Sequence, residues 1–254
     1  MAPKVATEFH VKLAHTAEDL RAAQRLRYQV FVAELGGTGL LVDHSAGLEQ
    51  DALDPFCDHL LLIDIRTDRV VGVYRLLRPE KAQEAGKYYS QGEYDLTPLL
   101  ASGRRILELG RSCLHPDVRG GTAMHQLWSA LAQYVATYQI EILFGVASFH
   151  GTDIAALAEP LSLLHHRHLA PPELRVRASE KSFQNMDLID EAELDRRAAM
   201  VQIPSLIKAY LRLGGCVGEG AYIDHAFNTV DVCLIMDTKQ MSARQARMYG
   251  GIDA

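Results

Sequence analysis

The sequence predicts an α/β fold in which a mixed β-sheet is flanked by helices. Two apolar, β-branched runs at residues 59–65 and 70–77 are separated by four polar residues, which indicates an antiparallel hairpin. A third apolar run at residues 105–111 is followed by a glycine-containing turn, a helical pattern and another strand. A strand, a crossover helix and a further strand indicate parallel neighbours. The sheet is therefore expected to be mixed.

The first long element is expected to be an amphipathic helix that begins after Thr16. The Thr16 hydroxyl can cap free N–H groups, and acidic residues follow in the first turn, where the helix dipole favours negative charge. The Gly36-Gly37 pair is expected to end the helix. Its apolar residues recur at helical spacing and are Leu20, Ala23, Leu26, Val30 and Phe31. After the hairpin, residues 79–103 are expected to form a loop.

In the third strand, Glu108 is expected to share a face with Ile106 and Gly110, because successive side chains of a strand point to opposite faces. The helix after the glycine turn carries one apolar stripe, which contains Met124, Leu127, Trp128, Leu131 and Val135. A strand at residues 141–147 is expected to follow this helix.

The second half of the chain is expected to be mainly helical before the last strand. The predicted helices lie at residues 152–164, 187–200 and 204–213, and the last strand at residues 231–236. Residues 165–181 are expected to be an exposed connection. The glycines at residues 214–220 have the wrong spacing for a dinucleotide fingerprint and follow a helix, so they indicate a helix stop and a loop. The chain is interpreted as one domain, residues 1–254, with a helical and loop insertion at about 152–213.

Composition excludes several function classes. The 254 residues carry 32 acidic and 26 basic side chains, with a formal net charge of −6 and no block of like charge, which argues against sequence-blind nucleic-acid binding. The N-terminus lacks a signal-peptide pattern, and no apolar run is long enough to cross a bilayer. Four scattered cysteines fit buried thiols in a reducing cytoplasm. We therefore expect a cytoplasmic protein.

No metal is expected. The run at residues 165–168 contains three histidines, but no second group of His or Cys residues with ligand spacing accompanies it. A solvated polar turn is therefore favoured over a metal site. No G-x-S-x-G nucleophile elbow occurs, so serine hydrolase chemistry is not indicated either.

Charges inside apolar stretches are the first candidates for a functional site. Glu108 lies within a strand expected to be buried, where a carboxylate is costly unless it is paired, hydrogen-bonded or used in chemistry. It either forms an ion pair with Arg75 or Arg111 or takes part in a reaction. Arg27 places another charge in an apolar run of the first helix. Together these residues suggest a polar cleft across the sheet.

Two further segments allow a structural and a functional interpretation. The turn at residues 118–123 places backbone N–H groups at a helix N-terminus, where a phosphate or another anion can bind, although glycine turns before helices are common. Asp51 and Asp54 precede the hairpin in a loop with Pro55. They either cap a turn or bind a substrate ammonium.

Several segments together resemble the acyl-carrier-protein-dependent branch of the GNAT-type N-acyltransferases, which includes acyl-homoserine-lactone synthases. They are Arg27-Tyr-Gln-Val-Phe31, Asp51-Ala-Leu-Asp54, Gly72-Val-Tyr-Arg-Leu-Leu77 and Glu108-Leu-Gly-Arg111. The chain is similar in more detail to the L-ornithine N-alpha-acyltransferases, at residues 111–121, 210–215, 218–222 and 227–232. This resemblance extends from about residue 20 to residue 237, and it is specific in the combination of segments.

The resemblance implies a GNAT-like fold, with Glu108 as general base and the turn at residues 119–122 as the contact for phosphopantetheine. The residues expected at the acyl donor are Cys113, Arg119, Gly120, Gly121 and Thr122. The usual GNAT pyrophosphate signature requires Gly at position 122 and Gly or Ala at position 124, where Thr122 and Met124 stand. A carrier protein presents a single phosphate, so a 3-hydroxyacyl group on acyl carrier protein is the expected co-substrate, with no tightly bound cofactor.

The expected reaction is attack of the L-ornithine α-amine on the acyl thioester, which gives lyso-ornithine lipid. Glu108 would accept a proton directly or through one water, and backbone N–H groups near residues 111–113 would stabilise the oxyanion. The substrate carboxylate would pair with Arg75 or Arg111. The residues expected to contact the amino acid are Arg27, Asp51, Asp54, Arg75 and Arg111. Asp51 or Asp54 would bind the side-chain ammonium.

Carrier proteins are acidic, so a basic docking face is expected, with Arg104, Arg105 and Arg119 as candidates; ordinary solvated arginines are the alternative. A lipid product implies transient contact with the cytoplasmic membrane surface. The helix at residues 204–213 either supplies that contact or packs in the core. Two other functions remain open: an acyl-homoserine-lactone synthase that uses S-adenosylmethionine, and a non-catalytic acyl-binding regulatory protein.

Overall fold

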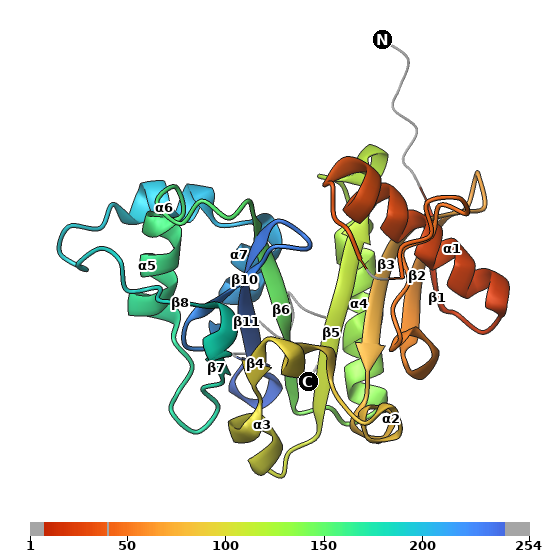
Figure 1. Ribbon diagram of the computed structural model, residues 1–254. Coiled ribbons are helices and arrows are strands. Elements are labelled where there is room, and N and C mark those ends of the chain that lie inside the picture. Colours follow the sequence, from red (N-terminus) through yellow and green to blue (C-terminus); the bar gives the residue numbers. More distant parts are fainter. Residues whose placement is uncertain (1–7, 40, 242–254) are drawn as a thin grey trace.

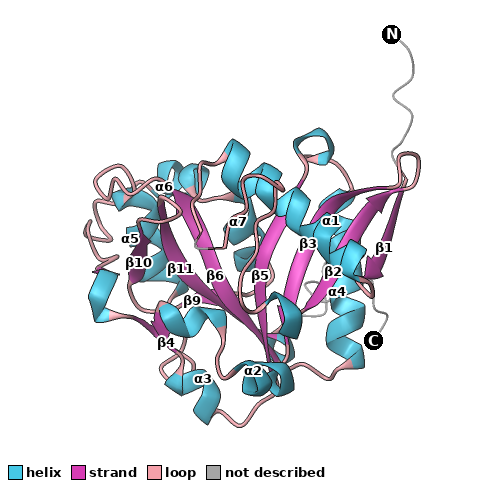
Figure 2. Ribbon diagram, turned by 45° about the vertical axis from the view of Figure 1, so that its right-hand side comes forward, coloured by secondary structure: helices cyan, strands magenta, loops and turns pink. Residues whose placement is uncertain are grey.

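The structure is a computed structural model, in which residues 8–39 and 41–241 are described. The expectation about a signal peptide concerns a segment that lies almost entirely outside these residues. One nine-stranded sheet with helices on its faces organises the described chain (Figures 1 and 2). Its strands follow the order β1-β2-β3-β5-β6-β11-β10-β8, and β9 pairs with β11. The expected α/β class with a mixed sheet is confirmed, since β5 and β6 are parallel and the other described pairs of this sheet are antiparallel.

The strands of the main sheet are β1 (Phe9–Leu13), β2 (Asp58–Asp64), β3 (Arg69–Leu77), β5 (Ile106–Leu114), β6 (Ile142–His150), β8 (Phe183–Gln184), β9 (Cys216–Val217), β10 (Ala221–Asp224) and β11 (Thr229–Asp237). A small second sheet pairs β4 (Tyr94–Asp95) with β7 (Arg177–Ala178). The helices are α1 (Ala17–Arg27), α2 (Pro79–Ala85), α3 (Thr97–Ala101), α4 (Ala123–Thr137), α5 (Ala158–His168), α6 (Arg196–Gln202) and α7 (Ser205–Arg212). A π-helix, η1 (Tyr28–Glu34), directly follows α1.

The first helix begins where the sequence predicts. Thr16 Oγ1 accepts a hydrogen bond from the backbone N–H of Asp19, and the Asp19 carboxylate accepts one from the backbone N–H of Thr16. This reciprocal capping box satisfies two N–H groups that a helix start leaves free. The helical path extends to Glu34, near the expected stop at Gly36, but its second half is the π-helix η1. Such wide turns occur frequently at functional sites.

The predicted hairpin is confirmed, and the structure shows which helix covers each face of its strands. Leu60 and Leu62 of β2 pack in the hydrophobic cluster that contains Leu127 of α4. Leu61 packs on the other face with Leu26 of α1. This alternation follows from the period of two in a strand. Helices α1 and α4 therefore cover opposite faces of the β2–β3 hairpin.

Two segments expected to be irregular and exposed contain ordered, buried elements. Residues 79–103 form α2, α3 and β4, and their buried side chains include Tyr94 and Leu99. In residues 165–181, Leu174 and Val176 are buried and β7 pairs with β4. The two loop assignments were therefore wrong. These elements are too short to show a periodic pattern in the sequence, and their burial depends on contacts with distant parts of the chain.

Other boundaries also differ from the expectation. Helix α5 starts at Ala158 instead of residue 152, and α6 starts at Arg196 instead of residue 187, because Asp195 caps its first turn through the N–H groups of Arg197 and Ala198. Strands β1 and β10 were not predicted. No described helix has the length and apolar character needed to cross a membrane.

The position of the functional cleft follows from how β5 and β6 separate. They pair only from Ile106 to Glu108, opposite Ile142 to Phe144. Immediately beyond these pairs lies Gly145, where an added Cβ would stand 2.1 Å from the carbonyl oxygen of Leu109. Glycine thus permits a backbone approach that no other residue allows. Past this point the strands diverge and leave an opening in the middle of the sheet.

Candidate active site

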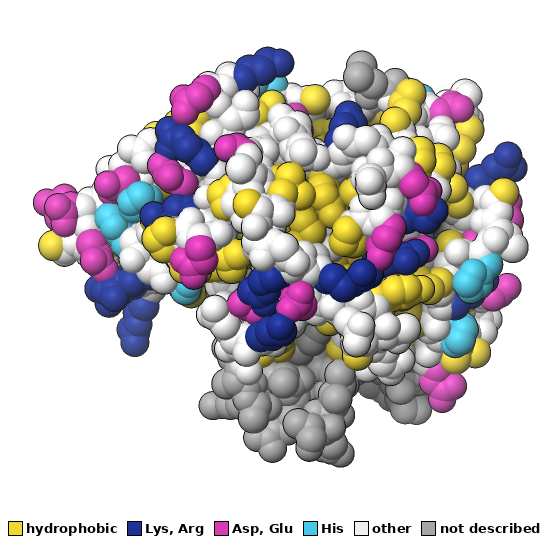
Figure 3. Space-filling model, turned by 90° about the horizontal axis from the view of Figure 1, so that it is seen from below, with side chains coloured by type: hydrophobic (Ala, Val, Ile, Leu, Met, Phe, Trp, Pro, Cys, Tyr) yellow, Lys and Arg dark blue, Asp and Glu magenta, His cyan; other side chains and the backbone are white. Residues whose placement is uncertain are grey.

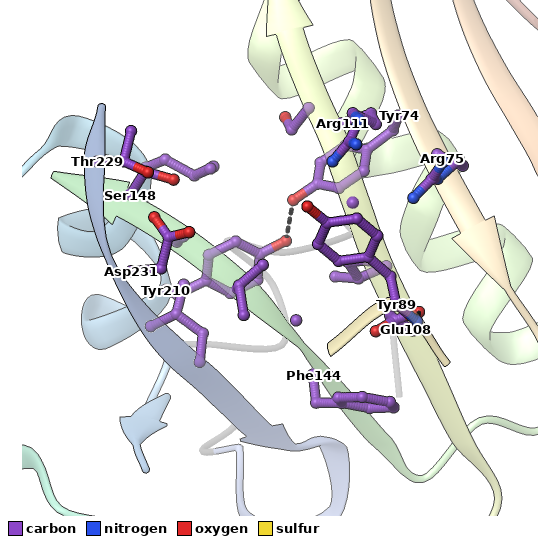
Figure 4. Close-up of a pocket in the computed structure, with 18 of the residues that line it drawn as sticks. Tyr74, Arg75, Tyr89, Glu108, Arg111, Phe144, Ser148, Tyr210, Thr229 and Asp231 are labelled. Atoms are coloured by element: carbon purple, nitrogen blue, oxygen red, sulfur yellow. Dashed lines mark hydrogen bonds between the residues drawn. The ribbon is translucent and has the colours of Figure 1, made fainter. Parts of the chain in front are cut away.

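A cavity of about 280 Å³ fills the opening between β5 and β6 (Figure 4). β5 lines it from residue 108 onward and β6 from residue 143 onward, and other parts of the wall come from β3, η1, α7 and β11. Tyr74 of β3 and Tyr210 of α7 join their hydroxyl groups across it at 2.5 Å. This hydrogen bond links β3 of the sheet to helix α7. Ile207 and Tyr210 are buried, so α7 packs in the core, which was one of the two interpretations of its sequence.

Two loops also cross the opening: the segment after η1 and the turn between β10 and β11. Thr38, which follows η1, donates backbone and side-chain hydrogen bonds to the carbonyl oxygen of Ala226, in the turn between β10 and β11. Phe227 in that turn contacts Gly37, where an added Cβ would lie 2.7 Å from the ring. Phe31 and Phe227 both line the cavity. The cleft is therefore closed over by segments that are about 190 residues apart in the chain.

A β-bulge directs two residues of β5 into the cavity. The register passes from Arg75 opposite Gly110 to Val73 opposite Cys113, so Arg111 and Ser112 together face one residue of β3. Arg111 adopts a positive φ of 51° at this bulge. Bulges of this kind re-aim side chains next to active sites. Both bulged residues line the cavity.

Glu108 lies at the closed end of the cavity, where β5 and β6 separate. It is 4% exposed, and its two oxygens accept hydrogen bonds from the backbone N–H groups of Tyr89 at 2.8 Å and Ser90 at 2.7 Å. Burial raises the pKa of this carboxyl, although these N–H groups act in the opposite direction. Among the described residues Glu108 has no ion-pair partner within 4.0 Å. The ion pair with Arg75 or Arg111, which was one of the two interpretations of Glu108, is therefore absent among the described residues. The carboxylate keeps lone pairs for another proton or a water.

Arginines occupy one wall of the cavity. Arg75 Nη1 donates hydrogen bonds to Asp51 and, at 3.0 Å, to Asp54 Oδ1. Arg111 is held by Glu49 and Asp51, with nitrogen–oxygen distances of 3.2 Å in both pairs. The pKa of Arg111 is raised, because the neighbouring Tyr89, Glu49 and Asp51 outweigh the burial that lowers it. Both arginines line the cavity, and ion pairs with carboxylates hold their guanidinium groups in place.

Arg27 and Asp54 were expected to contact substrate, but neither lines the cavity. Arg27 is fully buried and donates to Glu49 and, at 2.8 Å, to Asp54 Oδ1. Asp54 also accepts from Gln24, and its arginine partners lower its pKa despite burial. Three arginines and three carboxylates thus form one network that orients the cavity arginines. Sequence reasoning did not single out Glu49, which lies in a stretch without a recognisable pattern.

Aromatic rings cover the cavity arginines. The Arg111 guanidinium lies 4.7 Å from the ring centroid of Tyr89 and 5.5 Å from that of Phe227. Arg75 lies 5.7 Å from the centroid of the Tyr89 ring, and its guanidinium lies beside Gly110. Such contacts contribute about 0.5–1 kcal/mol each at exposed sites and more where water is excluded. Figure 4 shows Tyr89 between Glu108 and the arginines.

The residues expected at the acyl donor do not all meet in one place. Cys113 is buried outside the cavity, and burial raises the pKa of its thiol to about 12. Gly120, Gly121 and Thr122 form an exposed turn that starts α4 and does not line the cavity. Arg119 pairs through two nitrogens with the carboxylate of Glu34, at 2.6 and 2.7 Å. Since the preceding η1 residues reach the cavity wall, this pair ties the turn to the rim of the opening.

The arginines expected at the carrier-protein face are separated and paired. Arg104 forms two hydrogen bonds with the carboxylate of Asp237, and Arg105 pairs with Glu80 at 2.6 Å. Both stand before the start of β5, whereas Arg119 follows its end, so the three cannot flank one end of the cleft. On the face in Figure 3, Lys and Arg side chains lie among Asp and Glu side chains, around a patch of hydrophobic side chains.

Two groups of potential metal ligands occur among the described residues. His165 and His166, in the last turn of α5, lie near Asp187, which the sequence alone did not connect with them. Glu93, Asp224 and Asp231 place carboxylate oxygens within 4.8 Å of one another at the edge of the cavity. Sequence reasoning missed this acidic cluster, although Asp231 carried the same signal as Glu108: a carboxylate inside an apolar strand.

A domain model and two relatives of known name all match this chain as an acyltransferase. Residues 26–129 match the model of an acetyltransferase (GNAT) domain. The chain is 61% identical to the L-ornithine N(alpha)-acyltransferase of Rhodobacter capsulatus, over 95% of this chain and 94% of that protein. It is 39% identical to the L-ornithine N(alpha)-acyltransferase of Brucella abortus, over 94% of this chain and 88% of that protein.

Solved structures share the fold at low sequence identity. The acyl-homoserine-lactone synthase LasI superposes with a TM-score of 0.54 at 16% identity, covering 98% of this chain and 100% of that one. The CoA-dependent synthase BjaI, solved with S-adenosylmethionine and isopentyl-CoA, gives 0.52 at 17% identity and covers 96% of this chain and 88% of that one. The N-acyl amino acid synthase FeeM gives 0.51 at 10% identity, covering 98% and 100%.

Proposed function

Since the chain belongs to the L-ornithine N(alpha)-acyltransferase family and has a GNAT fold, we propose that it transfers a 3-hydroxyacyl group from acyl carrier protein to the α-amine of L-ornithine. The resemblance inferred from the sequence is confirmed at the level of family, fold and acyltransferase activity. Lyso-ornithine lipid is the product of the proposed reaction, as the first step of ornithine lipid biosynthesis.

The observation that carries the proposal is the cleft between β5 and β6, with Glu108 at its closed end and two arginines on one wall. An opening lined largely by apolar residues suits an acyl chain and the slender pantetheine arm. The arginine wall suits a carboxylate, because a guanidinium fork binds two carboxylate oxygens at once. The cleft therefore provides separate surfaces for the two substrates.

The proposed chemistry is acyl transfer with one proton to remove. The amine nitrogen attacks the thioester carbonyl, the C–N bond forms, the C–S bond breaks, and the phosphopantetheine leaves as a thiol that takes up a proton. Glu108 removes the amine proton, directly or through one water, which contributes a factor of about 100 to 10,000. Its raised pKa makes it a stronger base than a free carboxylate. Backbone N–H groups at the bulge of residues 111–113 are proposed to stabilise the oxyanion.

Acyl carrier protein is proposed as the donor because the turn at residues 119–122 departs from the CoA signature. The turn is exposed, and Arg119 already binds Glu34, so a single phosphate is a better match than a diphosphate. A lipid product also suggests transient contact with the cytoplasmic membrane surface, which sedimentation with anionic vesicles measures directly.

The test is an assay of the purified protein with L-ornithine and either 3-hydroxyacyl-acyl carrier protein or the matching CoA thioester, with products identified by mass spectrometry. We expect N-acylornithine from the carrier protein and far less from CoA. Glu108→Gln is expected to lower turnover at least about 100-fold, while Glu84→Gln on the exposed face of α2 is the control. Near-normal turnover of Glu108→Gln would defeat the catalytic assignment. A lactone formed from S-adenosylmethionine would instead identify a homoserine-lactone synthase, and acyl-carrier binding without any product would identify a regulatory protein.

A further inference from the structure

We propose that Glu93, Asp224 and Asp231 bind the side-chain ammonium of a cationic amino-acid acceptor, and that the hollow beside them admits this acceptor to the cavity. The inference rests on the proposed function, because it assigns one end of the acceptor. The acidic cluster takes the place of Asp51 and Asp54, which the sequence suggested as the ammonium contacts. The carboxylates of Asp51 and Asp54 are already bound to arginines.

The three carboxylates converge from separate parts of the chain. Glu93 precedes β4, Asp224 ends β10, and Asp231 lies in β11, yet one oxygen of each lies within 4.8 Å of the others. An ammonium group donates three hydrogen bonds, and three carboxylate oxygens at this spacing can receive them. The geometry thus matches a compact cation.

Two of these carboxylates are buried and incompletely bonded. Glu93 is 6% exposed and Asp231 is 4% exposed, and Glu93 Oε2 and Asp231 Oδ1 have no hydrogen-bond partner among the described residues. A buried acceptor without a partner is costly, and more so when it is charged. Asp224 differs, because its Oδ1 accepts hydrogen bonds from the backbone N–H groups of Ala226 and Phe227. The unsatisfied oxygens therefore point to a donor that arrives with a ligand.

The cluster also lacks a counter-ion. No Lys, Arg or His nitrogen of the described chain lies within 4.0 Å of these three carboxylates. The arginine network across the cavity is different, because there three guanidinium groups balance three carboxylates. Arg111 lowers the pKa of both Glu93 and Asp231, but the pKa of each carboxyl remains raised. An excess of buried negative charge favours a cationic ligand.

The position of the cluster fits an amino acid that spans the cleft. A second hollow of about 320 Å³ is lined by Asp51, Glu93 and Asp224, and it shares Tyr89 and Asp224 with the main cavity. In Figure 4, Arg75 and Arg111 lie on one wall and Asp231 on the other. A carboxylate at the arginines and a side-chain ammonium at the acidic cluster would leave the α-amine between them, within reach of the thioester.

Proton binding supports the same assignment. Burial, together with Asp231 and Asp224, raises the pKa of Glu93. Burial also raises the pKa of Asp231, although hydrogen bonds with the hydroxyl groups of Ser148 and Thr229 lower it. Glu108 faces the same group and adds to this rise, whereas Arg111 opposes it. Glu93 therefore holds a proton more tightly than a free carboxyl does in the empty site. A bound ammonium would favour its ionised form and expel the proton.

The decisive experiment compares L-ornithine with L-norvaline, which has the same carbon chain without the δ-amine, in wild type, Asp231→Asn and Glu93→Gln. The wild type is expected to prefer ornithine strongly. Each variant is expected to lose about 10- to 100-fold in kcat/KM for ornithine and to change little for norvaline, because only ornithine loses a charged hydrogen-bond partner. Asp68→Asn, in the exposed β2–β3 turn, is the matched control and is expected to behave as wild type.

Equal losses for ornithine and norvaline would overturn the proposal, since the cluster would then act on the shared part of the substrate or on the fold. Activity that requires a divalent cation and disappears with EDTA would overturn it as well, because a metal would occupy the cluster. A wild type that acylates no amino acid would instead refute the proposed function, so the two failures are distinguishable.

Calorimetry gives a readout that does not depend on turnover. Ornithine binding measured at pH 7.5 in buffers of different ionisation enthalpy is expected to release a proton in the wild type. Norvaline is expected to release none, and Glu93→Gln is expected to abolish the release with ornithine. Proton release that persists in Glu93→Gln would contradict the assignment of Glu93.

Discussion

Gly145 of β6 faces the carbonyl oxygen of Leu109 of β5 so closely that a Cβ on Gly145 would lie 2.1 Å from that oxygen. This contact stands where the parallel pairing of the two strands ends. One strand must bend away from the other past this point. The cavity between them therefore depends on a residue without a side chain, which is not itself a chemical participant.

Gly145→Ala is expected to destabilise the protein by about 1–3 kcal/mol, the usual cost of overpacking, because backbone atoms must shift to admit the methyl group. The rate of acyl transfer is expected to fall by more than the loss of folded protein accounts for, since the shift changes the width of the cleft. Urea denaturation and the transfer assay measure the two effects. Gly92→Ala, where nothing lies within 4 Å of an added Cβ, is the stability control. Unchanged stability in Gly145→Ala would show that the two strands can move apart without cost.

Arg111→Lys is expected to raise the KM for the amino acid about 10- to 100-fold, because an ammonium cannot bind a carboxylate through two parallel hydrogen bonds. The change in kcat is expected to be smaller. Arg25→Lys, in an exposed pair with Glu18, provides a control with the same chemical change. An unaltered KM in Arg111→Lys would remove Arg111 from substrate binding and leave Arg75 as the candidate.

Glu93 is expected to make stability fall as the pH rises. Its pKa is about 9 in the folded protein, above the ordinary value of 4.5, so between these values the folded state keeps a proton that the unfolded state has lost. The stabilisation is complete below pH 4.5 and is lost as the pH rises through 9. Glu93→Gln, which stays neutral, is expected to gain in free energy of unfolding relative to wild type between pH 6 and about 9.5. A pH-independent difference between Glu93→Gln and wild type in urea denaturation would contradict this.

The four cysteines are expected to resist alkylation in the folded protein at pH 7.5. Burial raises the pKa of Cys57 and Cys113 to about 12 and that of Cys216 to about 11, and Cys233 is fully buried. The reactive thiolate is therefore scarce at each site. Iodoacetamide labelling followed by mass spectrometry should show modification only after unfolding. Rapid labelling of Cys113 in the native state would show that this strand opens.

The sequence by itself determined the elements whose patterns are local. The helix start at Thr16, the β2–β3 hairpin and the apolar stripe of α4 all depend on neighbours within a few positions. Glu108 was recognisable for the same reason, as a carboxylate in an apolar strand. The segments that resemble acyltransferases added the family, which the comparisons confirm.

Only the tertiary structure decided which carboxylates have an arginine partner and which do not. Asp51 and Asp54 resemble ligand contacts in the sequence, but in the folded chain they form ion pairs with arginines on other elements. Asp231 and Glu93, 138 positions apart, meet only because β11 and the segment before β4 pack together, and their unsatisfied oxygens result from that packing. A sequence records which groups can carry charge, whereas the partners that neutralise them are set by long-range contacts.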